Sequence, residues 1–122
     1  MRRSEQRRAA VVALYQEDVT GSGTPPDRDF SRELVEGVRA QRQVLDELIA
    51  RHSVGWTLDR IAPLERNILR VALFEMLHRE DVPHEVAIDE AVEAAKELCA
   101  AEAPGFVNGI LGAVAREEAL PR

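Results

Sequence analysis

The chain has 122 residues with 45% hydrophobic and 31% charged side chains, and its formal net charge is −6. That length allows one domain, residues 1–122, to bury a core without disulfide bonds. The single cysteine excludes an internal disulfide and no apolar run is long enough to span a membrane, so we expect a cytoplasmic protein.

The charge is distributed unevenly along the chain. Residues 1–60 contain ten basic and ten acidic side chains, whereas residues 61–122 contain six basic and twelve acidic ones. The first eight residues include Arg2, Arg3, Arg7 and Arg8 against a single acid, Glu5. A basic end on an acidic body predicts two kinds of partner, one anionic and one cationic.

The first predicted helix covers residues 5–18, with Ser4 as its N-cap. Its inner side is apolar, but its first turn carries arginines, which the helix dipole disfavours at an N-terminus by a few tenths to about 1 kcal/mol. Cations placed there against that cost indicate a ligand-binding role. A loop rich in Gly and Pro is predicted at residues 20–27.

A second helix is predicted from Asp29 to His52, because apolar residues recur along it with helical spacing and Val44 widens their stripe. The segment after it breaks the pattern. We expect Trp56, beside a glycine, to fill a corner of the core. Residues 57–61 are predicted to form a short turn.

The central element is the helix predicted from Pro63 to Leu77. Its proline suits the first position of a helix, and no glycine or further proline follows before Pro83. Apolar side chains lie on nearly every side of it, which places it in the middle of the fold. Glu75 falls near its apolar face, so we expect this carboxylate to be partly buried and paired with an arginine. Arg70 is expected to pair with Glu75 or with another buried acid.

Two further helices are predicted, one over residues 84–100 and one beginning at Phe106, with a frayed tail from Glu117. The first of them carries an acidic row with i, i+4 spacing, made of Glu85, Asp89, Glu93 and Glu97. Because like charges at this spacing repel slightly, the row is either a solvated face or a surface for a basic protein. No segment alternates as a strand does, so the predicted fold class is all-α.

No arrangement typical of catalysis or metal binding emerges from the sequence. The histidines at positions 52, 78 and 84 are scattered, Cys99 lies on an apolar helix face, and the loop glycines lack a following Lys-Ser or Lys-Thr. We therefore predict no catalytic residue, no metal site, no cofactor and no enzymatic activity.

Short motifs occur in order along nearly the whole chain. They are Ala13-Leu14-Tyr15-Gln16, Leu34-Val35-x-Gly37-Val38, Leu64-Glu65-Arg66-x-Ile68-Leu69-Arg70, Val82-Pro83-x-x-Val86-Ala87-Ile88-Asp89-Glu90-Ala91 and Phe106-Val107-Asn108-Gly109-Ile110-Leu111. In this combination they resemble the NusB family of bacterial transcription antitermination factors.

The resemblance implies a compact helical fold of two packed three-helix bundles. It also implies a non-catalytic function, in which members pair with the ribosomal protein NusE and the pair binds the boxA element of ribosomal RNA operon transcripts. With NusA, NusG and RNA polymerase they form a complex that resists premature termination and supports processive rRNA transcription.

The resemblance further implies which residues face each partner. RNA is expected to follow a path of guanidinium groups that contact phosphates and rings that stack on bases, along Arg2, Arg3, Arg7, Arg8, Tyr15, Glu102 and Phe106. Glu65 is expected to face NusE, whose basic character suits the acidic second half of this chain. Because Glu5 interrupts the arginine run, RNA affinity is expected to depend on NusE.

Two alternatives stay open. The chain also resembles the helical RNA-binding domain that precedes an rRNA cytosine methyltransferase, or it serves as a protein-interaction module without RNA contact. The methyltransferase alternative requires a cofactor-binding sheet and catalytic cysteines downstream, which residues 1–122 do not contain.

Overall fold

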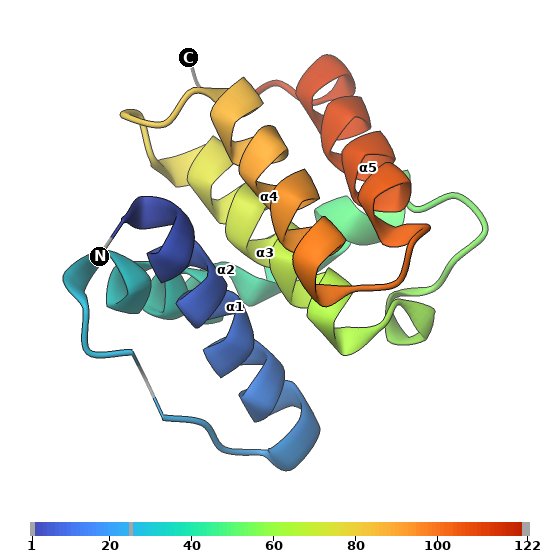
Figure 1. The fold of residues 1–122 in the computed structure, drawn as a ribbon. Helices are drawn as coiled ribbons and strands as arrows, with labels where there is room; N and C mark the ends of the chain where they lie inside the picture. The colour runs from blue at the N-terminus through green and yellow to red at the C-terminus, as the bar shows by residue number, and fades with distance from the viewer. Residues whose placement is uncertain (1, 25, 121–122) are drawn as a thin grey trace.

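The computed structural model describes residues 2–24 and 26–120, which are mostly helical (Figure 1). The helices in these ranges are α1 (Arg3–Thr20), α2 (Asp29–His52), the short 3-10 helix η1 (Leu58–Arg60), α3 (Pro63–His78), α4 (His84–Leu98) and α5 (Ala103–Glu117). No strand occurs within the described ranges, so the all-α prediction is confirmed.

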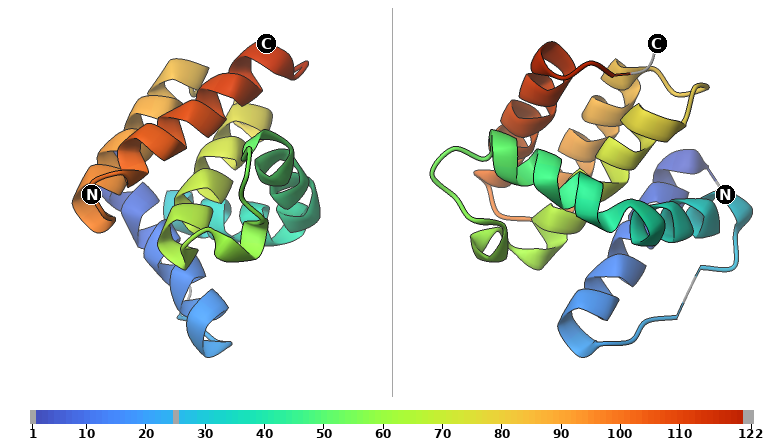
Figure 2. Two further views of the ribbon diagram at one scale, coloured as in Figure 1. Left: turned by 90° about the vertical axis from the view of Figure 1, so that its right-hand side faces the viewer. Right: turned by 180° about the vertical axis from the view of Figure 1, so that it is seen from behind.

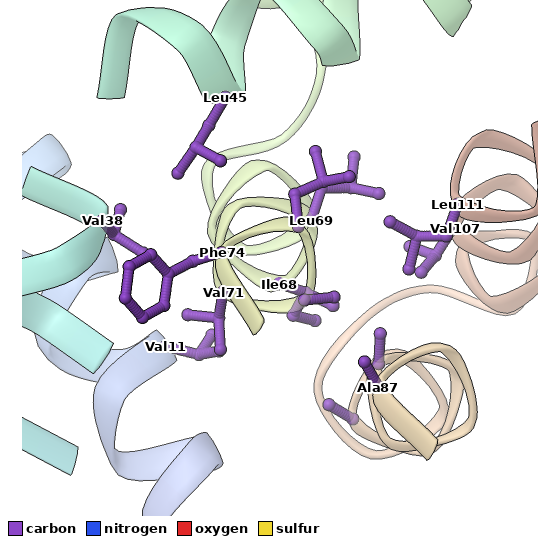
Figure 3. Packing of buried hydrophobic residues seen from close by; sticks show 14 of the residues in the cluster. Val11, Val38, Leu45, Ile68, Leu69, Val71, Phe74, Ala87, Val107 and Leu111 are labelled. Carbon is purple, nitrogen blue, oxygen red and sulfur yellow. The ribbon is translucent and has the colours of Figure 1, made fainter. Parts of the chain in front are cut away.

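The central helix of the fold is α3, as its apolar sequence predicts. Every residue from position 67 to 76 is buried, and apolar side chains of the other α-helices converge on it (Figure 3). On one side α3 packs with α1 and α2, and on the other with α4 and α5 (Figure 1; Figure 2). The two three-helix bundles therefore share α3, which explains how five α-helices build the architecture that the resemblance implies.

The N-terminal helix begins earlier than predicted. Because α1 starts at Arg3, Ser4 lies inside it, and its predicted role as N-cap is wrong. The Ser4 carbonyl instead accepts a hydrogen bond from Nη1 of Arg8 at 3.0 Å. At the other end, Gly21 takes a left-handed φ of 82° and its N–H donates to the Glu17 carbonyl, which ends the helix.

The second helix has the predicted bounds, and its apolar stripe faces the core. The ring of Phe74 lies against Gly37, so closely that a Cβ on this glycine would stand 2.2 Å from the ring Cζ. Val44 lies at the edge of the stripe and is exposed, so the prediction that it widens the buried face is wrong.

A buried polar cluster joins α1, α2 and α3. Arg70 on α3 is 3% exposed and donates to both carboxylate oxygens of Asp46 on α2, at 2.7 and 3.0 Å, and to Asp18 on α1 at 2.8 Å. Burial raises the pKa of Asp18, but hydrogen bonds from Asn67 and Arg42 outweigh it and the net shift is downward. Arg70 thus pairs with acids other than Glu75, one of the two expected outcomes.

The end of α5 is held more firmly than the predicted frayed tail suggests. Just after the helix, Glu118 accepts a hydrogen bond from Arg51 at 2.8 Å, and its carboxylate lies 2.7 Å from Nε2 of His52. These contacts fasten the chain to the end of α2. The predicted tail and the predicted loop at 20–27 also include positions 25, 121 and 122, which lie outside the described residues.

Candidate functional surfaces

The first two arginines of the chain are accessible. Arg2 is exposed and its Nε donates to Glu5 at 3.2 Å. Arg3 is about half exposed, with Nη1 3.0 Å from Asp81 and its guanidinium 4.4 Å from the centroid of the Phe30 ring. Both can therefore offer N–H donors to an anionic ligand, and their predicted contact with RNA stays a prediction.

The Arg7 side chain points inward. Its Nε and Nη2 donate to the two carboxylate oxygens of Glu75 at 2.7 and 2.8 Å, and Glu75 is 1% exposed. Burial lowers the pKa of Arg7, but the bonds to Glu75 outweigh it and the net shift is upward. The predicted arginine partner of Glu75 is thus Arg7. The expectation that Arg7 faces RNA is not met, because this ion pair holds its guanidinium inside the protein.

Arg8 joins α1 to the acidic row of α4. Its guanidinium is paired with Glu97, and its side chain is 25% exposed. Elsewhere in the row, Lys96 lies 3.2 Å from Glu93, while Glu85 and Asp89 are exposed. The row is therefore exposed at its start and paired with α1 at its end, and its use as a surface for a basic protein stays open.

Three guanidinium groups surround the ring of Phe30. Those of Arg3, Arg7 and Arg79 lie 4.4, 5.3 and 5.2 Å from its centroid, within the range of cation–π attraction. Hydrogen bonds from Arg79 and Arg3 lower the pKa of Asp81 to about 2. The cluster thereby fixes the start of α1 against the start of α2 and the turn after α3, so the accessible arginines stand on a rigid base.

Tyr15 lies about two turns beyond Arg8 on α1. It lies on the same face as Arg8 and Val12, at positions spaced by four and three residues, and is half-buried. Arg2, Arg3, Arg8 and Tyr15 are the accessible or partly accessible residues of this segment that the resemblance assigns to RNA, and we call them the α1 surface.

A second surface lies where the chain enters α3 and α5. A hollow of about 340 Å³ is lined by two aromatic rings, two carboxylates, an arginine and small apolar groups: Trp56, Arg60, Ile61, Ala62, Glu65, Glu102, Ala103 and Phe106. We call it the aromatic hollow. It brings together Glu65, Glu102 and Phe106, which the resemblance assigns to two different partners.

Trp56 is presented to solvent by a tight turn. The Trp56 N–H donates to the Ser53 carbonyl at 3.1 Å, Oγ of Ser53 donates to the Trp56 carbonyl at 3.1 Å, and Gly55 supplies a φ of 83°. The indole is 52% exposed and packs edge-on to Phe106, with ring centroids 6.3 Å apart and an interplanar angle of 68°. The prediction that Trp56 fills a corner of the core is wrong, because this turn carries the ring outward.

The carboxylate of Glu65 is half-buried in the hollow. Burial raises its pKa, and the nearby Glu102 carboxylate raises it further. Burial and the Glu65 carboxylate also raise the pKa of the Cys99 thiol, which keeps this thiol protonated and poorly nucleophilic. Because Cys99 follows the end of α4 and Arg8 pairs with Glu97 near that end, the end of α4 lies between the α1 surface and the aromatic hollow.

In the ranges 2–24 and 26–120, no group of three or more His, Cys, Asp or Glu side chains is placed to hold a metal ion. No helix there has both the length and the apolar character needed to cross a bilayer.

Comparison with known proteins gives consistent results. The NusB family profile matches residues 4–116. The transcription antitermination protein NusB of Frankia casuarinae is 52% identical over 96 residues, which cover 79% of this chain and 71% of the relative. A solved structure of T. maritima NusB matches with a TM-score of 0.85 and 32% identity, covering 98% of this chain and 94% of the other. A chain of the crystal structure of the antitermination factors NusB and NusE in complex with dsRNA has the same fold, with a TM-score of 0.79, 23% identity and coverage of 95% and 98%.

Proposed function

Because this chain belongs to the NusB family, we propose that it is a transcription antitermination factor that binds the boxA element of rRNA operon transcripts together with NusE. The family match over residues 4–116 is the observation that carries the proposal. Assembly with NusA, NusG and RNA polymerase follows from the same function and is part of the proposal. The solved complex of NusB, NusE and dsRNA supports the choice of partners.

The α1 surface is the proposed RNA contact. Arg2, Arg3 and Arg8 offer guanidinium groups to phosphates, and the partly accessible ring of Tyr15 can stack on an unpaired base. To contact a phosphate, Arg8 must break its ion pair with Glu97, which reduces the net binding free energy gained from that contact. Arg7 acts indirectly, because its ion pair with Glu75 holds α1 in place.

Glu65 is the proposed contact with NusE. Its carboxylate is half-buried beside an aromatic wall, and the surrounding second half of the chain carries the excess of acidic groups. A basic ribosomal protein complements that charge. The two partners thus meet different surfaces, with the end of α4 between them.

The proposal is tested by fluorescence anisotropy with a labelled boxA RNA and a scrambled RNA of equal length and composition, with and without NusE. We expect the chain plus NusE to prefer boxA. Arg3→Ala and Arg8→Ala should each weaken binding and reduce the slope of log K against log salt by about 0.7, the value for one phosphate contact on a single strand. Arg116→Ala, an exposed arginine in the last turn of α5, is the matched control.

Equal binding of boxA and scrambled RNA in the presence of NusE would contradict the proposed function. Binding of NusE without any RNA affinity of the mixture would instead favour a protein-interaction module. If Arg116→Ala reduced the slope as much as Arg3→Ala, the effect would come from net charge and the α1 surface would lose its assignment.

A further inference from the structure

The N-terminal arginines are neutralised within the protein itself. Each of the four has a carboxylate partner: Arg2 bonds to Glu5 and Arg3 to Asp81, while Arg7 and Arg8 pair with Glu75 and Glu97. The composition of this segment predicts a strongly cationic surface, yet the folded chain places acids from α1, α3, α4 and the turn after α3 beside it. The attraction of the free α1 surface for phosphate is therefore weaker than the number of its arginines indicates.

The pair of Arg8 and Glu97 joins two helices that pack mainly on other partners. Helix α1 packs on α2 and α3, whereas α4 packs on α3 and α5. Residues of both helices line a hollow of about 350 Å³, and these are Arg2, Ser4, Glu5, Arg8, Glu90, Glu93 and Glu97. Nη1 of Arg8 also donates to the Ser4 carbonyl at 3.0 Å, which helps to hold the guanidinium beside the hollow. A phosphate that approaches Arg8 through the hollow meets the Glu97 carboxylate already paired there.

A structural role explains this ion pair less well than a role in RNA binding. The Glu97 side chain is 56% exposed, and in the part of the chain that the structure describes it has no second ion pair or hydrogen bond. Ion pairs this accessible to water contribute little to folding stability. The buried pair of Arg7 and Glu75 already fixes α1 to the core. Loss of the Glu97 carboxylate should therefore leave the fold intact and change mainly what Arg8 can bind.

We propose that Glu97 is an intramolecular competitor of RNA, which occupies the Arg8 guanidinium in the free protein and must be displaced by a phosphate. This inference rests on the proposed function and deepens it, because it names a residue that regulates the RNA contact without itself contacting RNA. Binding exchanges one anionic partner of Arg8 for another, so Arg8 adds less affinity than an unpaired arginine would. RNA that makes few contacts loses a larger share of its binding free energy to this exchange than RNA held jointly with NusE. Glu97 thus suppresses RNA binding by the chain alone.

A double-mutant cycle tests the competition, by anisotropy with the labelled boxA RNA in the presence of NusE. Glu97→Gln keeps the size of the side chain but removes its charge, and it should raise RNA affinity about two- to five-fold, as expected for release of an exposed ion pair. In the Arg8→Ala background the same substitution should have no effect, because the guanidinium for which Glu97 competes is gone. Glu85→Gln is the matched control, since it removes an exposed charge of the same helix about 18 Å from position 97 along the axis. Its effect should be the same with and without Arg8.

The outcomes separate competition from the other roles of Glu97. An increase in affinity that is equal with and without Arg8 would mean that Glu97 acts only through net charge, which would overturn the proposal. Unchanged or weaker RNA binding by Glu97→Gln would refute it as well. Thermal melting followed by circular dichroism should place Glu97→Gln within about 4 °C of wild type, and a larger loss would make the pair a structural clasp instead. If wild type with NusE bound boxA and scrambled RNA equally, the proposed function would fail, but the cycle would still report whether Glu97 competes for Arg8.

Discussion

The ion pair of Arg7 and Glu75 makes the sharpest stability prediction. Replacing Arg7 by Met keeps a straight side chain of similar length in the gap between α1 and α3 but removes the charge that faces Glu75. We expect the variant to lose about 3–5 kcal/mol of unfolding free energy, the range observed when one partner of a buried pair is removed.

The magnitude follows from the geometry. Two unit charges about 4 Å apart attract by about 4 kcal/mol at the effective dielectric constant of a protein near 20. Glu75 is 1% exposed, so in the variant it keeps the cost of burial and loses that attraction. Because domains of this kind are stable by about 5–15 kcal/mol, the loss is a large fraction of the total and lowers the melting temperature by roughly 10–20 °C.

Urea denaturation followed by far-UV circular dichroism measures the effect. Arg2→Met, at an exposed arginine of the same segment, is the control and should change the unfolding free energy by less than about 0.5 kcal/mol. The double variant Arg7→Met with Glu75→Leu should recover most of the loss, because it removes the uncompensated charge. A stable Arg7→Met variant that had lost only RNA affinity would refute the reasoning and return Arg7 to the RNA contact.

Two further perturbations test local packing and electrostatics. Gly37→Ala should destabilise the protein by about 1–3 kcal/mol in thermal denaturation, because the new Cβ would overlap the Phe74 ring and this cost outweighs the gain in helix propensity of about 1 kcal/mol. Gly109→Ala is the control and should stabilise the protein, because its Cβ meets nothing within 4 Å. Equal effects at both positions would contradict the close approach of Phe74 to Gly37. NMR titration should show the Asp81 carboxyl with a pKa of about 2, below its ordinary value of 3.8, and this pKa should rise toward 3.8 in Arg79→Ala. Because the folded-state pKa is lowered, the stabilisation is present above pH 3.8 and is lost as the pH falls toward 2. A titration midpoint near 3.8 in the wild type would rule out the hydrogen bond from Arg79 to Asp81.

The helices were predictable because their signals are local. Pro63 marks the start of α3. The apolar surface of α3 extends around the whole helix, so the helix must be packed on every side whichever elements surround it. The bounds of α2 were predictable as well, because apolar residues recur along it with helical spacing. The start of α1 was predicted too late in the chain, because a serine indicates an N-cap only weakly. Packing of the N-terminal arginines extends the helix to Arg3, ahead of Ser4.

The site was only partly predictable, because side-chain direction depends on contacts between distant segments. Arg7 precedes Val11 by four residues and so shares the buried ridge of α1, a signal that could have paired it with Glu75 from the sequence. The exposure of Trp56 depends on the turn at Gly55 and on Phe106, fifty positions later, and carried no such signal.

The shared position of α3 has a consequence for how the molecule melts. If either bundle unfolded, one buried side of α3 would be exposed to water. Both bundles should therefore unfold in a single cooperative transition. A ligand bound to only one bundle then raises the melting temperature of the entire domain. Each partner thus stabilises residues against unfolding even where it does not contact them.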